Sequence, residues 1–230
     1  MIQFNEIFNR AVSLFDDPDI RKKCVIDPAG YQKDMRAFLI NGINYFYEPT
    51  EIANKLTQYS DQEGQIEVID GENTDVYKLS TNPVEGAVFS YKIGNEFVRG
   101  SYDAQTSSVT FPRIVTTEQT CTVVWYYAGA FTADFGSIFR PELNRNAIMN
   151  RIKTILAHCL LCAWGDGEKN RALEFRNLLS DADLATYSPA NSAKAKTSWH
   201  DQVLREMDTL VVDLSWSIAS TPRGGSQFGK

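Results

Sequence analysis

The sequence predicts an α+β protein in which a helical bundle frame carries an inserted antiparallel β lobe and an extended C-terminal arm. Apolar residues recur at helical spacing in residues 1–59 and again in 141–220. Between them, residues 60–140 alternate apolar with polar side chains and are rich in Val, Thr, Tyr and Phe, as strands are. The last ten residues, 221–230, hold three glycines and a proline and cannot build a core.

The first part of the predicted frame consists of several helices. An amphipathic helix is expected from Phe4 to Phe15, because its apolar residues follow a three-and-four spacing. Asp17 and Asp27 each precede a proline, which predicts that both cap the start of a helix. The second of these helices is the longer and ends before Pro49.

The β lobe is expected to be a small sandwich or barrel-like sheet of about six short strands joined by tight turns. Gly94 and Asn95 separate two alternating runs and predict a hairpin, because both residues tolerate positive φ. A second hairpin turn is predicted from Asp70 to Asn73. The predicted strands are 65–69, 76–79, 87–93, 96–99, 108–111 and 120–128.

The second part of the frame contains long helices. One is predicted to begin at Pro141 and to end at the sequence Gly165-Asp166-Gly167, with a further helix over 169–179. Pro189 then begins a last helix of about 30 residues, or about 45 Å at 1.5 Å per residue. So long a helix favours a bundle strut or an assembly surface. Its apolar stripe is expected to be Trp199, Val203, Met207, Leu210, Leu214 and Ile218.

The acidic charge is concentrated in the predicted β lobe. The chain has a formal net charge of -6, and residues 60–140 hold 11 acidic and 5 basic side chains. Tight binding of nucleic acid is disfavoured, because affinity for phosphates depends on clustered Lys and Arg. The simplest interpretation is a well-solvated lobe. No apolar run reaches the roughly 20 residues of a membrane span, and the first residues lack a signal peptide, so we expect an intracellular product without a membrane anchor.

No sequence pattern predicts catalysis, a cofactor or a metal. Cys159 and Cys162 form a CxxC beside His158, but a second such pair is missing, and buried thiols are the better interpretation. The second histidine, His200, is expected to face solvent or a partner. The acidic residues between 70 and 75 lack the spacing of a calcium loop. We therefore predict that the chain is not an enzyme.

A resemblance to a known family comes from the second half of the chain. The run from Glu174 to Ser188 reads EFRNLLSDADLATYS and precedes the last long helix. Together with the plan of a helical bundle, a β insertion and a C-terminal arm, it resembles the neck, or head-to-tail connector (adaptor), proteins of tailed bacteriophages. The likeness in plan covers most of the chain, and the likeness in sequence covers about residues 142–218.

The resemblance implies a structural virion protein, made in the host bacterial cytoplasm, that joins the phage head to the tail. It implies a ring of about twelve copies beneath the portal, in contact with the portal and with a tail or second neck protein, and no catalysis or cofactor. In such connectors the arm reaches an adjoining ring. The candidate interface residues at the matching positions are Thr221, Pro222, Arg223, Gln227, Phe228 and Lys230.

Two matters stay open. The acidic insert could line the lumen, where it would repel passing DNA without binding it, or it could face outward or meet the tail. The alternative function is a non-catalytic tail accessory module whose β lobe binds carbohydrate or a protein. Trp125, Tyr126 and Tyr127 could form a carbohydrate-stacking face, although packing in the core is the better expectation because neighbouring strand residues point to opposite faces.

Overall fold

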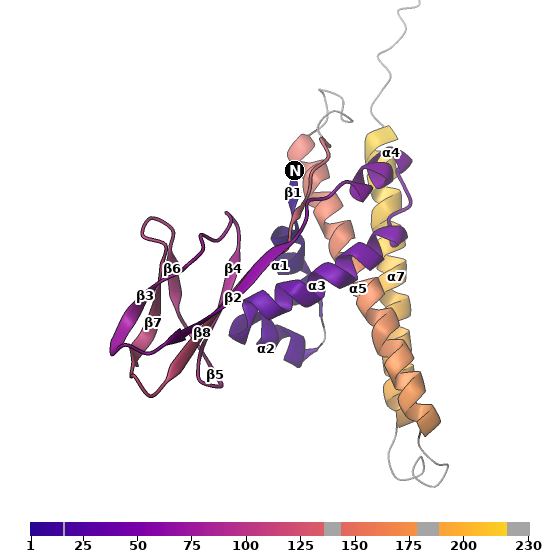
Figure 1. The fold of residues 1–230 in the computed structure, drawn as a ribbon. Coiled ribbons are helices and arrows are strands. Elements are labelled where there is room, and N and C mark those ends of the chain that lie inside the picture. Colours follow the sequence, from indigo (N-terminus) through magenta and orange to yellow (C-terminus); the bar gives the residue numbers. More distant parts are fainter. Residues whose placement is uncertain (16, 136–143, 179–188, 220–230) are drawn as a thin grey trace, which may run out of the picture. The chain divides into compact units, whose positions relative to one another are not determined.

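The computed structural model describes residues 1–15, 17–135, 144–178 and 189–219 and contains both helices and antiparallel sheets (Figure 1), which confirms the α+β class. The predicted arm, residues 221–230, lies outside the described residues. The chain forms two compact units. We name them the helix unit (Met1–Ile2, Phe38–Gln58 and Phe131–Lys230) and the sandwich unit (Gln3–Ala37 and Tyr59–Ala130).

This division differs from the predicted one because residues 3–37 group with the strands rather than with the other helices. Backbone and side-chain contacts account for the grouping. The backbone N–H of Phe4 donates to the carbonyl of Gly129 at 3.0 Å, and the N–H of Ala29 donates to the Ser90 hydroxyl at 3.0 Å. Helices predicted to belong to one frame are therefore divided between the two units.

Two antiparallel sheets of the sandwich unit enclose one apolar core. The first has the order β2 (Glu63–Asp70), β8 (Thr120–Tyr127), β4 (Val88–Ile93), β5 (Glu96–Val98). The second has the order β3 (Thr74–Lys78), β7 (Ser108–Val115), β6 (Ser101–Asp103). Because strand residues alternate between faces, each sheet supplies one apolar face to the core. The core consists of Tyr77, Leu79, Tyr91, Ile93, Val109, Phe111, Val115, Cys121 and Val123.

One of the two predicted hairpins is present. Strands β4 and β5 pair with Ile93 opposite Glu96, and Gly94 has the positive φ that the turn requires. The hairpin predicted at Asp70–Asn73 is wrong, because β2 and β3 belong to different sheets. Gly71 allows this crossover, since a Cβ there would lie 1.9 Å from the carbonyl oxygen of Thr116.

Helices α1 (Phe4–Leu14) and α2 (Pro18–Ile26) and the first part of α3 (Pro28–Gly42) belong to the sandwich unit. Both predicted caps are present: Asp17 accepts from the N–H of Asp19 at 2.8 Å, and Asp27 accepts from that of Gly30 at 3.1 Å. The carboxylate of Asp27 also accepts from the buried Ser90 hydroxyl at 2.5 Å, which ties the start of α3 to β4.

Arg36 on α3 is a buried cation that the apolar pattern did not reveal. Its guanidinium donates to the carbonyl of Ala128 at 3.0 Å and lies 5.6 Å from the ring centres of both Phe4 and Tyr59. The two aromatic faces and the carbonyl replace part of the hydration that the charge loses on burial.

The helix unit is dominated by α5 (Arg145–Leu178) and α7 (Pro189–Ala219), which lie side by side (Figure 1). The short helices η1 (Ile43–Tyr45), α4 (Thr50–Ala53) and η2 (Asn54–Thr57) accompany them. The short strands β1 (Ile2–Gln3) and β9 (Ala130–Phe131) pair in a third, two-stranded sheet, and each strand has one residue in either unit.

The predicted end of a helix at Gly165–Gly167 is wrong, since α5 continues through it to Leu178. Close packing explains why residue 165 is a glycine: a Cβ at this position would lie 2.5 Å from the ring of His200 on α7. The edge-to-face contact of Trp164 with Trp199, with ring centres 5.3 Å apart, lies beside it. Glycine here permits two helices to approach and does not break either one.

Candidate assembly surface

One face of each long helix is buried in the seam between them. On α5, the buried apolar residues include Ile148, Ile152, Ile155, Leu156, Cys159 and Leu160. On α7, Val203, Met207 and Leu214 are buried as predicted, but Val211 takes the place expected for Leu210. Sulfur atoms meet in this seam, where Cys159 Sγ lies 3.8 Å from Met207 Sδ.

The opposite side of α7 exposes large apolar side chains. Trp216 is 68% exposed and Val212 is 48% exposed. They are four residues apart and therefore neighbours on one helix face, with Asp208 one turn earlier. The exposed ring of Tyr47 stands at the start of this row, and its hydroxyl reaches Asp208 Oδ1 at 3.5 Å. We call Tyr47, Asp208, Val212 and Trp216 the outer stripe.

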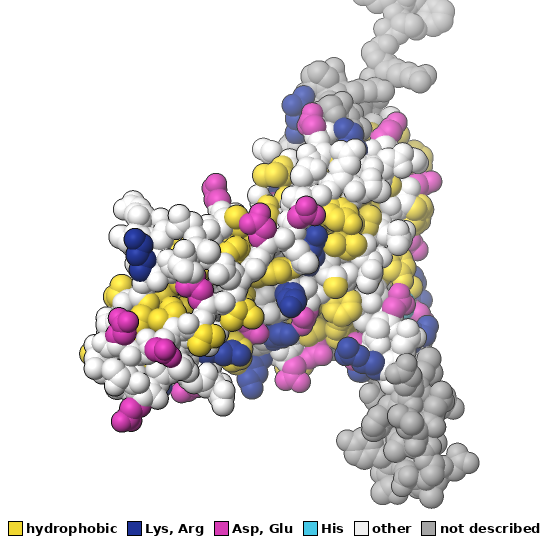
Figure 2. Space-filling model, in the orientation of Figure 1, with side chains coloured by type: hydrophobic (Ala, Val, Ile, Leu, Met, Phe, Trp, Pro, Cys, Tyr) yellow, Lys and Arg dark blue, Asp and Glu magenta, His cyan; other side chains and the backbone are white. Residues whose placement is uncertain are grey.

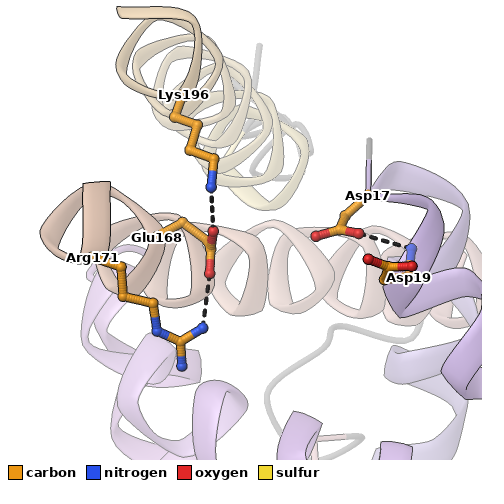
Figure 3. Close-up of polar contacts among 5 residues, drawn as sticks. All are labelled: Asp17, Asp19, Glu168, Arg171 and Lys196. Atoms are coloured by element: carbon orange, nitrogen blue, oxygen red, sulfur yellow. Dashed lines mark hydrogen bonds and ion pairs between the residues drawn. The ribbon is translucent and has the colours of Figure 1, made fainter. Parts of the chain in front are cut away.

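Polar contacts join α5 to α7 beside the apolar seam. Glu168 is largely buried and accepts from Lys196 at 2.5 Å and from Arg171 at 3.0 Å (Figure 3). Lys196 comes from α7 and the other two residues from α5. Figure 3 also shows Asp17 bonded to the backbone of Asp19 at the start of α2. Of these contacts, the Glu168–Lys196 ion pair is the one that joins the two long helices.

A second polar cluster involves Tyr45, Asp166 and His200. The Tyr45 hydroxyl donates to Asp166, and His200 Nε2 lies 3.2 Å from the other carboxylate oxygen, without the alignment of a hydrogen bond. His200 is buried, contrary to the expectation that it faces solvent or a partner. Burial and the hydrogen bond with Asp166 raise the pKa of the Tyr45 hydroxyl, so the phenol keeps its proton at neutral pH. The cluster links η1, α5 and α7.

Both cysteines of the CxxC are buried. Burial raises the pKa of the Cys162 thiol to about 12, with Asp166 and Asp208 adding to the effect. Burial also raises the pKa of Cys159 well above its ordinary value. Among the described residues, no group of three or more His, Cys, Asp and Glu side chains is placed to hold a metal ion. The Nδ1 atom of His158 lies 2.9 Å from the carbonyl oxygen of Thr154 and forms a hydrogen bond with it.

The aromatic residues of β8 are not arranged as a carbohydrate platform. Trp125 is only 6% exposed, and Tyr126 is buried with its hydroxyl donating to Gln62. Neither ring offers a free face for a sugar to stack on. Tyr127 is partly buried. The preferred expectation, that these residues pack inward, agrees with this burial.

A groove of about 580 Å³ lies on the sandwich unit beside β2. Its floor includes Gly64 and Ile66 of β2 and Val124 and Tyr126 of β8, and Lys33 of α3 forms one wall. A Cβ at Gly64 would lie 2.9 Å from the Tyr126 ring, so the absence of a side chain lets that ring cover the strand.

The six interface residues predicted in the arm, between Thr221 and Lys230, lie outside the described residues. Among the helices that the structure describes, none combines the length and the apolar character that crossing a bilayer demands. Comparison with protein-family models, with curated proteins and with solved structures found no match to this chain.

Sequence reasoning missed the outer stripe and the exposed face of β2. Trp216 and Val212 fall between the members of the apolar stripe of α7, and this out-of-phase position is a signal that could have identified them. Ile66 and Val68 alternate as any half-buried strand would. Only the sheet order shows that their side chains lie on an edge strand.

Proposed function

We propose that this chain is a structural subunit that joins the head of a tailed bacteriophage to its tail, assembled as a ring next to the portal. The observation that carries the proposal is the outer stripe on α7. A tryptophan that is 68% exposed, one turn from an exposed valine, is costly to keep in water and typical of a protein interface.

The helix unit supports a role in assembly. Two long helices that pack together, joined by the Glu168–Lys196 ion pair, offer a surface that identical neighbours could repeat around a ring. The stripe runs along α7 toward Ala219, where the described part of this helix ends.

The finer description of the fold belongs to the same proposal. The segments of the helix unit flank the strands in the sequence, which supports a helical frame with an inserted β lobe. The sandwich unit carries the acidity of the chain, with 16 acidic and 10 basic side chains, whereas the helix unit has 13 of each. A lobe of this charge would repel passing DNA if it lined the lumen.

The alternative role is a tail accessory module that binds carbohydrate or a protein. Of these two ligands, only the protein has support. Burial of Trp125 and Tyr126 argues against stacking of a sugar on these rings. The open edge of β2 is suited to a protein partner. Such binding is compatible with a neck subunit and does not require a different function.

The proposal is tested by mixing the protein with the portal protein encoded in the same genome and measuring the complex by sedimentation velocity. The wild type should add to the portal as a complete ring. Replacement of both Val212 and Trp216 by Ser should abolish this addition, because two large apolar contacts per subunit are lost at once.

Val25→Ser is the matched control, since Val25 is about as exposed as Trp216 (70% against 68%) but lies on α2 of the sandwich unit. It should bind the portal as the wild type does. Unchanged addition of the V212S/W216S protein would contradict the role of the outer stripe. Failure of the wild type to bind any portal would contradict the function itself.

A further inference from the structure

The acidity of the sandwich unit is concentrated along one strand. Residues 61–75 contain six acidic side chains and no basic one. They comprise β2, the crossover and the start of β3. Asp61, Glu63 and Asp70 are exposed, and among the described residues none of them forms an ion pair. Figure 2 shows Asp and Glu side chains on the surface over the strands of the sandwich unit.

The same strand exposes aliphatic side chains. Ile66 is 65% exposed and Val68 is 68% exposed. They are two residues apart and so lie on the same face of the sheet, away from the sandwich core. The groove beside Ile66, floored by Val124 and Tyr126, gives this face a depression that one further apolar side chain could occupy.

Within the part of the chain that the structure describes, β8 is the only strand that pairs with β2, so β2 is also an edge strand. Its eight residues pair with β8 in regular register from Glu63 to Asp70 without a bulge, and it contains no proline or lysine. Natural edge strands often carry a bulge, a proline or a lysine, which hinders pairing with another chain. A long, regular edge with exposed aliphatic residues is a template for strand addition.

We propose that the free edge of β2 binds an extended segment of a partner protein in which apolar residues alternate with Lys or Arg. The segment adds to the sheet as a fifth strand. Its apolar side chains cover Ile66 and Val68, and its cations point to the opposite face of the strand, where the unpaired carboxylate of Glu63 lies. The carboxylate of Asp70, at the end of the strand, adds to the attraction.

Charge identifies the occupant as a basic segment rather than a second copy of β2. Pairing of β2 with a second copy of itself would bring together two strands that each contain Glu63, Glu67 and Asp70 and no Lys or Arg. Like charges directly opposite each other destabilise a strand pair. Glu67 does not take part in recognition, because Ser80 and Thr81 already bind its carboxylate.

The experiment measures binding of an eight-residue peptide in which Lys and Val alternate to the full-length protein, by calorimetry at two salt concentrations. The double variant I66K/V68K should weaken the affinity by at least about tenfold, since it removes the apolar contact and adds like charge. The E63Q/D70N variant should also bind more weakly and lose part of the salt dependence. Both variants change exposed side chains only.

Two controls separate strand addition from simple attraction. Ile114→Lys changes a residue of similar exposure (59%) on β7, which is the central strand of the other sheet, and should bind the peptide as the wild type does. A peptide of the same sequence with methylated backbone nitrogens keeps its charge but cannot pair with a strand, and should not bind.

Several results would overturn the proposal. The first is that the methylated peptide binds the wild type as tightly as the unmethylated peptide does. The second is that the I66K/V68K and E63Q/D70N proteins both bind the peptide as tightly as the wild type does. The third is that the wild type does not bind the peptide. A wild-type dimer that I66K/V68K dissociates would assign the edge to a second copy of this chain instead. The proposal does not depend on the outer stripe, so it can fail while the proposed function stands.

Discussion

Gly42 and Gly167 are both helical glycines of the helix unit, yet the space around them differs. A Cβ at Gly42, the last residue of α3, would lie 2.2 Å from the backbone oxygen of Cys159. A Cβ at Gly167 would meet only the Phe38 ring, at an ordinary contact distance of 3.9 Å. The first glycine allows α3 to end against α5, whereas the second has no steric reason to be glycine.

These surroundings predict opposite effects of one substitution. Gly42→Ala should lower the free energy of unfolding by about 2 kcal/mol or more, because backbone rather than a mobile side chain blocks the new methyl group. Gly167→Ala should raise it by about 0.5–1 kcal/mol through helix propensity. Urea unfolding followed by far-UV circular dichroism measures both. A stable G42A protein would show that α3 and α5 do not approach as closely as described.

The sequence predicted burial correctly for residues that belong to a regular apolar pattern along one helix. Phe4, Ile7 and Phe8 of α1 are buried as their spacing requires. Arg36 and Ser90 could not be predicted in this way, because a polar residue is buried only when specific partners are at hand. Those partners are distant in the sequence, 92 residues away for Arg36.

At the scale of elements, Glu67 connects β2 to the segment that follows β3. Its carboxylate accepts hydrogen bonds from the backbone and hydroxyl of Ser80, at 3.0 and 2.8 Å, and from the N–H of Thr81 at 3.2 Å. Partial burial pushes the pKa of Glu67 up, but these hydrogen bonds outweigh it, so that the pKa is lowered. The two sheets are therefore linked at this edge by an ionised carboxylate.

This lowered pKa has a consequence for stability. A carboxyl group whose folded pKa lies below its unfolded value of about 4.3 stabilises the fold above that pH, and the effect disappears as pH falls through the folded pKa. Glu67→Gln should therefore cost about 1 kcal/mol at pH 7 and progressively less in acid. Unfolding midpoints of both proteins from pH 7 to 3 test this, and a constant difference would contradict it.

The positions of elements were easier to predict than their connections. The strands 65–69, 87–93 and 120–128 correspond to β2, β4 and β8 within a few residues. The crossover at Gly71 and the uninterrupted course of α5 through Gly165 were not predicted, because both depend on what packs against the glycine. Local sequence cannot distinguish a glycine that breaks a helix from one that admits a neighbour.

At the scale of the whole molecule, the sequence predicted the α+β class but a different grouping of its helices. Residues 3–37 belong with the strands because of contacts such as those of Phe4 with Gly129, which no periodicity encodes. The outer stripe on α7 and the free edge of β2 lie in different units. The proposed subunit thus has one surface for its own ring and another for a partner.

The central claim is that the outer stripe of α7 joins neighbouring subunits in a ring at the portal. Electron microscopy of the wild-type protein mixed with the portal from the same genome tests it most directly. We expect a closed ring on the portal, with Trp216 buried at each boundary between adjacent subunits. A ring in which Trp216 remains in solvent, or a portal that carries no ring, would contradict the claim.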